Sequence, residues 1–362
     1  MPRRGARAVL LVVALLLATG APAHVVMGEK SLHLRVAEAD IVLRGRVVDP
    51  ASMFVAADGR TRRVLLVVDV LEEIKGVAGA KSIRIAQDGH AEAEYRQGDE
   101  ALFFLKPIDR SLELRSLAVP GGATHVSGQE HDDAFLLRGS PGRTLLAATR
   151  SFAAAEQAAT AQGRIALIRG ATIDLLTSGD DQLATSALAS LVLAPDAEWI
   201  TAEDLPRVHS TISNPANPIG LRAGLIDELE RRGLMDGEAA RLAILRGAPA
   251  RDLPSAIRAL GPKAGPEVRA LLIGFLDAES GTTPEVVAET AIVLGASRAP
   301  HALEPLAKCL NRPERRIRNA AIRGLGLFGS AEAAEILAEA GESHPDPKTR
   351  RRASAELRKS RP

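Results

Sequence analysis

Near the C-terminus, residues 317–326 read IRNAAIRGLG, and the anchor positions of this segment recur along half of the chain. Successive copies begin 38, 31, 34, 31 and 32 residues apart. A fixed period of this size predicts stacked helical hairpins, because one hairpin cannot bury its apolar face alone. The anchors are pairs of residues eight positions apart: Leu183 and Leu191, Leu221 and Leu229, Asp252 and Leu260, Val286 and Leu294, Ile317 and Leu325, Thr349 and Leu357.

Further features repeat inside the copies. The second anchor is followed by glycine in three of them, and another leucine follows twelve residues after it, at Leu272, Leu306 and Leu337. This pattern resembles the HEAT repeats of bacterial proteins, including the PBS-lyase type, over about residues 180–360. The resemblance implies an α-solenoid, a fold that usually binds other macromolecules. The last copy has no second helix after Leu357, so we expect it to form a polar cap.

An arginine directly follows the first anchor in three of the six copies, at Arg222, Arg318 and Arg350. Recurrence at one repeat position favours a structural role. We expect these side chains to donate hydrogen bonds to carbonyls or acids of the adjacent hairpin. The alternative is a basic ladder on a binding surface.

The region from residue 39 to 137 has the pattern of β-strands. Turn signals such as Asp49-Pro50 separate the apolar runs, and a short helix is expected at about residues 31–37. The five candidate strands are residues 41–48, 63–71, 82–86, 101–105 and 112–117. Five short strands with no long helix between them predict a small antiparallel barrel or sandwich.

Three motifs in this region resemble a bacterial netrin-like domain: ADIV at residues 39–42 with GRV at 45–47, VLEEIKG at 70–76 and YRQGDEALFFL at 95–105. That group has an OB-type barrel and includes the tissue inhibitors of metalloproteinases. The eukaryotic inhibitors begin with a disulfide-bonded cysteine that reaches the protease zinc. This chain has one cysteine, Cys309, and so departs from that pattern.

The N-terminus has the pattern of a secretory signal peptide. Arg3, Arg4 and Arg7 precede an apolar run at residues 8–17, and an Ala-x-Ala site ends at Ala23. The run is shorter than the roughly 20 residues that span a bilayer. We therefore expect cleavage after Ala23, a periplasmic or secreted protein, and no transmembrane segment in the mature chain.

The composition narrows the classes of partner. The net charge is +1 and aromatic residues are only 2% of the chain, so we expect no nucleic-acid partner. From residue 311 to 362 there are twelve Lys/Arg and seven Asp/Glu. The basic run at residues 348–361 is typical of a solvated final helix, and an anionic surface contact is the alternative.

The sequence contains few candidates for catalytic or metal-binding residues. If cleavage follows Ala23, the amine and ring of His24 become potential ligands for copper or zinc. The other histidines of this region are His33, His90, His125 and His131, and the nearby acids are Asp88, Asp132 and Asp133. No two of these histidines have a spacing that is typical of metal ligands. No nucleophile elbow, P-loop or dinucleotide fingerprint is present. Cys309 is expected to be a small buried apolar residue. We assign no catalytic, cofactor or metal residues.

The sequence thus predicts an α+β multidomain protein: a signal peptide (1–23), a small antiparallel β-barrel-like domain of OB type (24–145) and a HEAT-like α-solenoid of helical hairpins (150–362), joined at residues 139–142. The expected function is non-enzymatic protein binding or scaffolding by the solenoid, without a cofactor. A netrin-like protease inhibitor or metal-binding module in the β domain is the first alternative. An enzyme of unrecognised type is the second.

Overall fold

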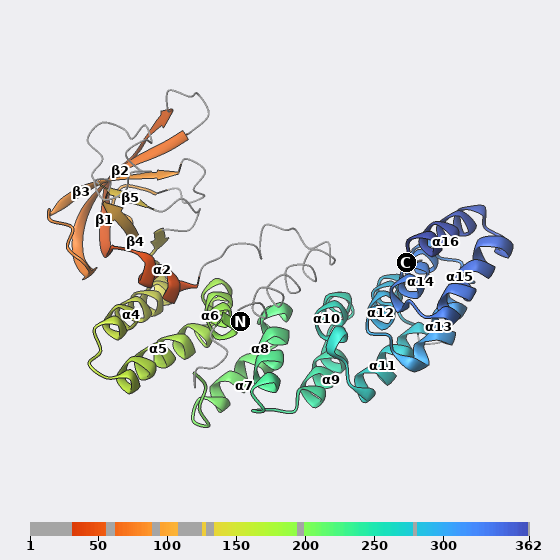
Figure 1. The fold of residues 1–362 in the computed structure, drawn as a ribbon. Helices are drawn as coiled ribbons and strands as arrows, with labels where there is room; N and C mark the ends of the chain where they lie inside the picture. The colour runs from red at the N-terminus through yellow and green to blue at the C-terminus, as the bar shows by residue number, and fades with distance from the viewer. Residues whose placement is uncertain are drawn as a thin grey trace, which may run out of the picture. The chain divides into compact units, whose positions relative to one another are not determined.

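The computed structural model describes residues 31–55, 62–88, 95–107, 125–127, 134–193, 199–277 and 281–360. The chain divides into two compact units, Met1–Val208 and His209–Pro362 (Figure 1). The division into domains at residues 145–150 stays a prediction. Residues 139–142, expected at the junction, form the first turn of helix α4 (Gly139–Glu156).

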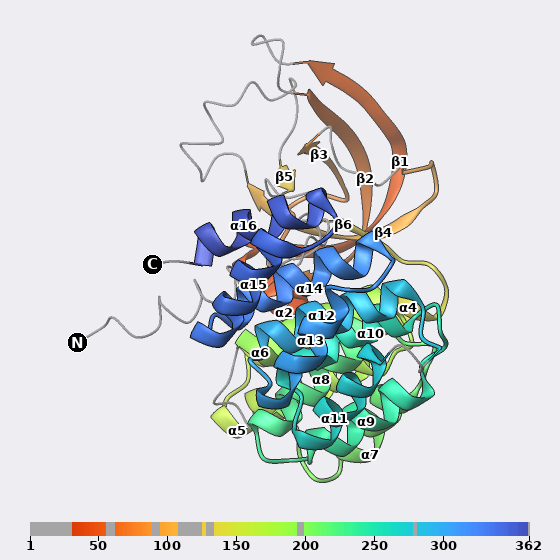
Figure 2. The same cartoon turned by 90° about the vertical axis from the view of Figure 1, so that its right-hand side faces the viewer.

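A six-stranded sheet fills the first part of the first unit, and its long strands β1 and β2 are visible in Figure 2. Its strands are β1 (Ile41–Val55), β2 (Arg62–Lys75), β3 (Ser82–Asp88), β4 (Glu100–Pro107), β5 (His125–Ser127) and β6 (Ala134–Leu136). The order is β1-β2-β3-β5-β4-β6, and β1 also pairs with β4. All pairs are antiparallel except β3 with β5, which are parallel.

These pairings make a small, partly open barrel, as the sequence predicted. β3 and β5 are joined at only two positions, Ile85 with His125 and Ala86 with Val126. The interior is filled by alternate apolar side chains of the strands, among them the fully buried Leu43, Leu66 and Phe103. Four of the five predicted strands are confirmed, and residues 112–117 lie outside the described residues.

One predicted turn is wrong. Asp49 and Pro50 lie inside β1, which continues to Val55. The pairing of β1 with β2 shifts register between Asp49 and Ser52, so the pair forms a β-bulge that bends the strand instead of ending it.

Helix α2 (Leu32–Glu38), which the sequence predicted, contacts both the barrel and the first long helices. Its Leu32 amide donates to Ser186 Oγ of helix α6 (Asp181–Leu193) at 3.0 Å. Lys75, the last residue of β2, donates from Nζ to the carbonyls of Val36 and Ala37 at the end of α2 (2.7 and 3.0 Å). Those carbonyls have no partner inside the helix, so the lysine acts as its C-terminal cap.

Helix α4 begins a set of helices that continues to the C-terminus. The remaining helices of the first unit are α5 (Ala161–Leu176) and α6 (Asp181–Leu193), and α7 (Leu205–Ser213) spans the boundary between the units. The second unit contains α8 (Ile219–Arg231), α9 (Gly237–Gly247), α10 (Leu253–Leu260), α11 (Pro266–Leu276), α12 (Pro284–Ala296), α13 (Leu303–Cys309), α14 (Arg315–Phe328), α15 (Ala331–Ser343) and α16 (Pro347–Ser360). Short 3₁₀ turns at Gly261–Lys263 and Pro300–Ala302 lead into α11 and α13.

The second unit is built of helical hairpins stacked in two layers. Helices α8, α10, α12, α14 and α16 pack successively against one another, and α9, α11 and α13 form the second layer (Figure 1). Most repeat anchors face the interface: Leu229, Leu294 and Leu325 are fully buried, as are Leu272 and Leu306 of the second layer. The anchor Asp252 is an exception, because it is exposed. The predicted helical repeat is therefore confirmed. In the described part of the chain, no helix is both long and apolar enough to cross a membrane.

Candidate binding surface at the last repeats

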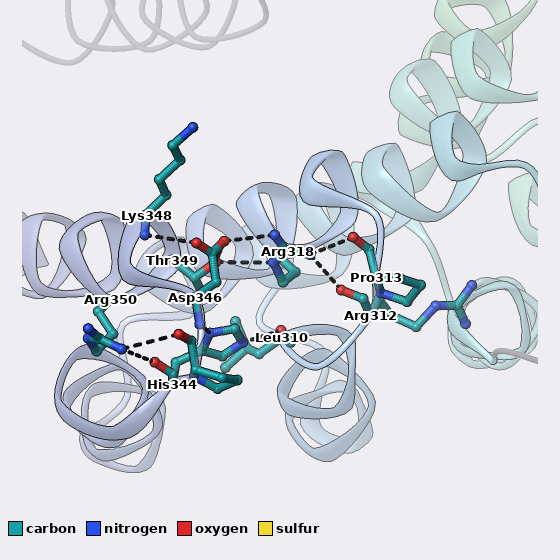
Figure 3. A network of polar contacts seen from close by, with 10 residues as sticks. Leu310, Arg312, Pro313, Arg318, His344, Asp346, Lys348, Thr349 and Arg350 are labelled. Atoms are coloured by element: carbon teal, nitrogen blue, oxygen red, sulfur yellow. Dashed lines mark hydrogen bonds and ion pairs between the residues drawn. The ribbon is translucent and has the colours of Figure 1, made fainter.

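A network of polar contacts around Arg318 joins the last two repeats (Figure 3). Arg318 lies in the first turn of α14, and its side chain is only 13% exposed. Its Nη1 donates to the carbonyls of Arg312 and Pro313 (2.8 and 2.6 Å), which belong to the loop before the helix. Its Nη2 pairs with Asp346 Oδ2 at 2.8 Å, and its Nε donates to Thr349 Oγ1 at 3.1 Å. The guanidinium of Arg318 thus joins the loop before α14 to the start of the next repeat.

The other two recurring arginines make the same kind of contact. Arg350 Nη1 donates to the carbonyls of His344 and Pro345 (2.6 and 3.3 Å), and Arg222 Nε donates to the Ile212 carbonyl (2.6 Å). These carbonyls lie at or just after the end of the preceding helix, where backbone acceptors have no helical partner. The predicted structural role of the three arginines is confirmed.

Asp346 is the acceptor at the centre of the network. The Lys348 amide donates to its Oδ1 (3.0 Å), and Thr349 Oγ1 donates to its Oδ2 (2.9 Å). These hydrogen bonds, and then the Arg318 guanidinium, hold the pKa of Asp346 well below its usual range. The carboxylate therefore caps the start of α16 and stays ionised at neutral pH.

The buried imidazole of His344 completes the loop before α16. Its Nδ1 accepts from the Asp346 amide (3.0 Å), so the ring hydrogen lies on Nε2, which donates to the Leu310 carbonyl (2.9 Å). The loop that carries α16 is thus tied to the end of α13, one repeat away. These hydrogen bonds fix the position of the start of α16.

A groove of about 770 Å³ lies between α15 and α16. It is lined by Gly341 of α15 and by Pro347, Arg350, Arg351, Ser354 and Arg358 of α16. Three of the six lining side chains are arginines, and none is acidic. Arg351 and Arg358 are exposed, and within the described residues they have no ion-pair partner. A Cβ on Gly341 would lie 2.6 Å from Ser354 Oγ, so the glycine allows the two helices to approach closely at the groove.

Some arginines of the earlier repeats do have acidic partners. Arg258 of α10 pairs with Glu289 of α12, and Arg316 of α14 pairs with Glu285 of α12 at 2.8 Å. Buried Arg241 of α9 lies between Asp227 and Glu230 of α8. The local charge excess that the sequence indicated lies on α16, which holds six Lys/Arg and one acid, whereas the four acids of α15 balance the four arginines of α14.

The candidate metal ligands are not brought together in the described residues. His24, His90, His131, Asp132 and Asp133 lie outside them, and only the backbone of Asp88 and His125 is described, at the end of β3 and in β5. In the described part of the chain, no three His, Cys, Asp or Glu side chains form a group that could hold a metal ion.

His33 has a structural setting. Its ring lies 5.1 Å from the Phe152 ring and 5.8 Å from the Trp199 ring, measured between centroids. Burial lowers the pKa of His33, although the charge of Glu156 opposes this. The imidazole packs α2 against the first long helix.

Cys309 is buried, as predicted. Its Sγ contacts the Leu276 carbonyl at 3.9 Å, and burial raises the pKa of the thiol to about 11. A thiol with so high a pKa is a poor nucleophile at neutral pH. It belongs to the packing of α13 against α11.

Comparison with known protein families matches residues 274–358 to the HEAT repeats. The matched segment begins in α11 and ends in α16, so it contains the Arg318 network and the groove. This region is a HEAT-repeat region. Repeats of this family suggest a protein-interaction scaffold and are generally non-catalytic. Among curated proteins, none matches the sequence.

Proposed function

We propose that this chain is an exported, non-enzymatic scaffold that binds another protein through its helical repeats. The observation that carries the proposal is the HEAT-repeat region at residues 274–358, which lies in a continuous stack of hairpins from α8 to α16. Stacked hairpins present a long surface made of many short elements, which suits binding to an extended partner surface. Export is supported by the signal-peptide pattern at residues 1–23.

The rigid polar network supports the same proposal. Arg318, Asp346 and His344 fix the loop between α15 and α16 with contacts to two neighbouring elements. A preorganised surface loses less conformational entropy when a partner binds. These contacts give the repeat surface a defined shape in the absence of a partner.

The test is to capture a partner from an envelope extract with the full mature chain, identify it, and then measure binding with the purified partner. Cross-linking of the purified complex would then locate the contact through lysines. Exposed Lys263, Lys308 and Lys359 report on the repeats, whereas Lys81 and Lys106 report on the barrel. Cross-links on the repeat lysines support the scaffold proposal.

Cross-links confined to the barrel lysines would instead support the netrin-like inhibitor or metal-binding alternative. That alternative further requires that His24 be the true N-terminus. Adding one residue before His24 would then abolish protease inhibition or metal binding by the β domain. The scaffold proposal expects that this added residue leaves binding of the partner unchanged. Mass spectrometry of the protein from its native host, compared between cytoplasm and envelope, tests export and the cleavage site together.

A further inference from the structure

We propose that the groove between α15 and α16 binds an acidic segment of a partner protein through Arg351 and Arg358. This inference rests on the proposed scaffold function and names the chemistry of the partner. Both arginines are exposed, line the groove and lack an acidic partner in the described residues. Arginine binds carboxylates through two parallel N–H donors, which gives geometric as well as electrostatic preference.

The spacing of the arginines suits an extended peptide. Arg351 and Arg358 are seven residues apart on α16, which is two helical turns and about 10 Å along the axis. Both therefore lie on the same side of the helix. Residues three apart in a polyproline II conformation are about 9 Å apart and also share a side. Two carboxylates with that spacing can reach both arginines at once.

The remaining lining residues fit a peptide backbone. Ser354 lies between the two arginines in sequence, and its hydroxyl already donates to the Arg350 carbonyl at 3.0 Å. Its oxygen keeps acceptor capacity for a backbone N–H of the ligand. Pro347 is exposed and has a short, rigid side chain, so a peptide chain can approach the groove beside it.

Two other anionic partners fit less well. A membrane-binding helix needs an exposed apolar face opposite its basic face. The apolar residues of α16 face inward instead, because Ala353 is buried and Leu357 is partly buried. A nucleic-acid strand is usually held by aromatic stacking as well as by charge, and no aromatic side chain lines the groove.

The experiment measures binding of a fluorescein-labelled twelve-residue peptide, with Glu at every third position among Pro and Ala, to the full mature chain. A peptide with Gln in place of each Glu is the ligand control. The test variant is R351Q/R358Q. The matched control is R164Q/R246Q, which removes the same charge from exposed arginines of α5 and α9 that also lack partners in the described residues.

We expect the Glu peptide to bind, the Gln peptide to bind at least tenfold more weakly, and R351Q/R358Q to lose about 5- to 30-fold in affinity. R164Q/R246Q should stay within twofold of wild type. No binding of the Glu peptide, or an equal loss in both double variants, would overturn the proposal. Binding to vesicles containing phosphatidylglycerol that depends on Arg351 and Arg358 and exceeds binding of the peptide would also overturn it, in favour of a lipid surface.

The two proposals fail separately. If the chain retains an identified partner through repeat cross-links while the Glu peptide does not bind, the scaffold proposal stands and the groove assignment is wrong. Far-UV circular dichroism and the melting temperature of each variant check folding. Because all four substituted arginines are exposed and Gln favours helix, we expect both measurements to match wild type.

Discussion

Replacing Arg318 with alanine should loosen the last two repeats without affecting the first unit. The side chain donates to two loop carbonyls and pairs with Asp346, and it is only 13% exposed. Each lost hydrogen bond costs about 1 kcal/mol. The third hydrogen bond, from Nε to Thr349 Oγ1, adds about 0.5–1 kcal/mol, because that hydroxyl keeps its own bond to Asp346. The partly exposed ion pair with Asp346 contributes little beyond this. The expected total is about 2.5–3 kcal/mol, since the loop carbonyls regain only part of their bonding from water.

Hydrogen exchange measured by mass spectrometry resolves this effect along the chain. A loss of about 2.5–3 kcal/mol corresponds to roughly 70- to 160-fold faster exchange of protected amides that open with these repeats. We expect this acceleration in peptides from α14 and α16. Peptides from α4, in the other unit, should exchange at the wild-type rate.

Two further variants test whether the Arg318 network holds the last two repeats together. Arg315→Ala removes an exposed arginine without a partner in the described residues, three positions before Arg318 in the same helix, and should change exchange less than threefold. Arg318→Lys keeps the charge but cannot reach all four acceptors, so it should fall between the other two. If Arg318→Ala accelerates exchange no more than Arg315→Ala, the network does not hold the repeats together and the reasoning is wrong.

Three more predictions follow from the packing and the charges. Gly295→Ala should lower the stability of the second unit by at least about 2 kcal/mol, because a Cβ would lie 2.1 Å from the Gly324 carbonyl oxygen of α14; Gly274→Ala, where a Cβ meets nothing within 4 Å, should be neutral or stabilising by thermal denaturation. Cys309 should not react with a thiol reagent at pH 8 in the native state and should react fully in urea, because burial raises its pKa to about 11; rapid native labelling would contradict the packing. Glu228→Gln should lower the melting temperature at pH 7, and the difference from wild type should shrink as pH falls below about 4. Burial alone would raise the pKa of Glu228, but hydrogen bonds from Arg231 and Arg232 lower it overall, so its contribution is present at neutral pH and lost on acidification; exposed Glu267→Gln is the control.

The helical repeat could be predicted from sequence because its signal is local and recurs in register. Leu294 and Leu325 each occupy the same position of a hairpin, and burial at the same interface requires the same residue type. The role of Arg318 followed from recurrence as well. Helices α4 and α5 precede the copies that share the anchors, although the predicted solenoid began at residue 150 and so included α5.

The barrel was harder to predict, because partner strands decide its details. β5 and β6 have three residues each, too few to show the alternation of a strand in the sequence, although β6 is wholly apolar. Both strands pair with β4. Asp49-Pro50 has the local signal of a turn, but β2 pairs on both sides of it and carries the strand onward. The groove is likewise a property of how α15 approaches α16, and only the basic run at residues 348–361 indicated it.

The ion pair between Arg316 of α14 and Glu285 of α12 has no equivalent at the same repeat position between α16 and α14 among the described residues. Glu285, Arg316 and Lys348 are equivalent, since each directly precedes the first anchor of its copy. Arg316 pairs backward with Glu285, whereas the residue one repeat behind Lys348 is Arg316 itself, which already has its acid. A helix that only caps the stack needs polar residues of either sign, so neutral or mixed charges would have served solubility equally well. Arginines that line a groove without an acid are therefore more than a cap requires, and this excess is what the acidic-peptide experiment examines.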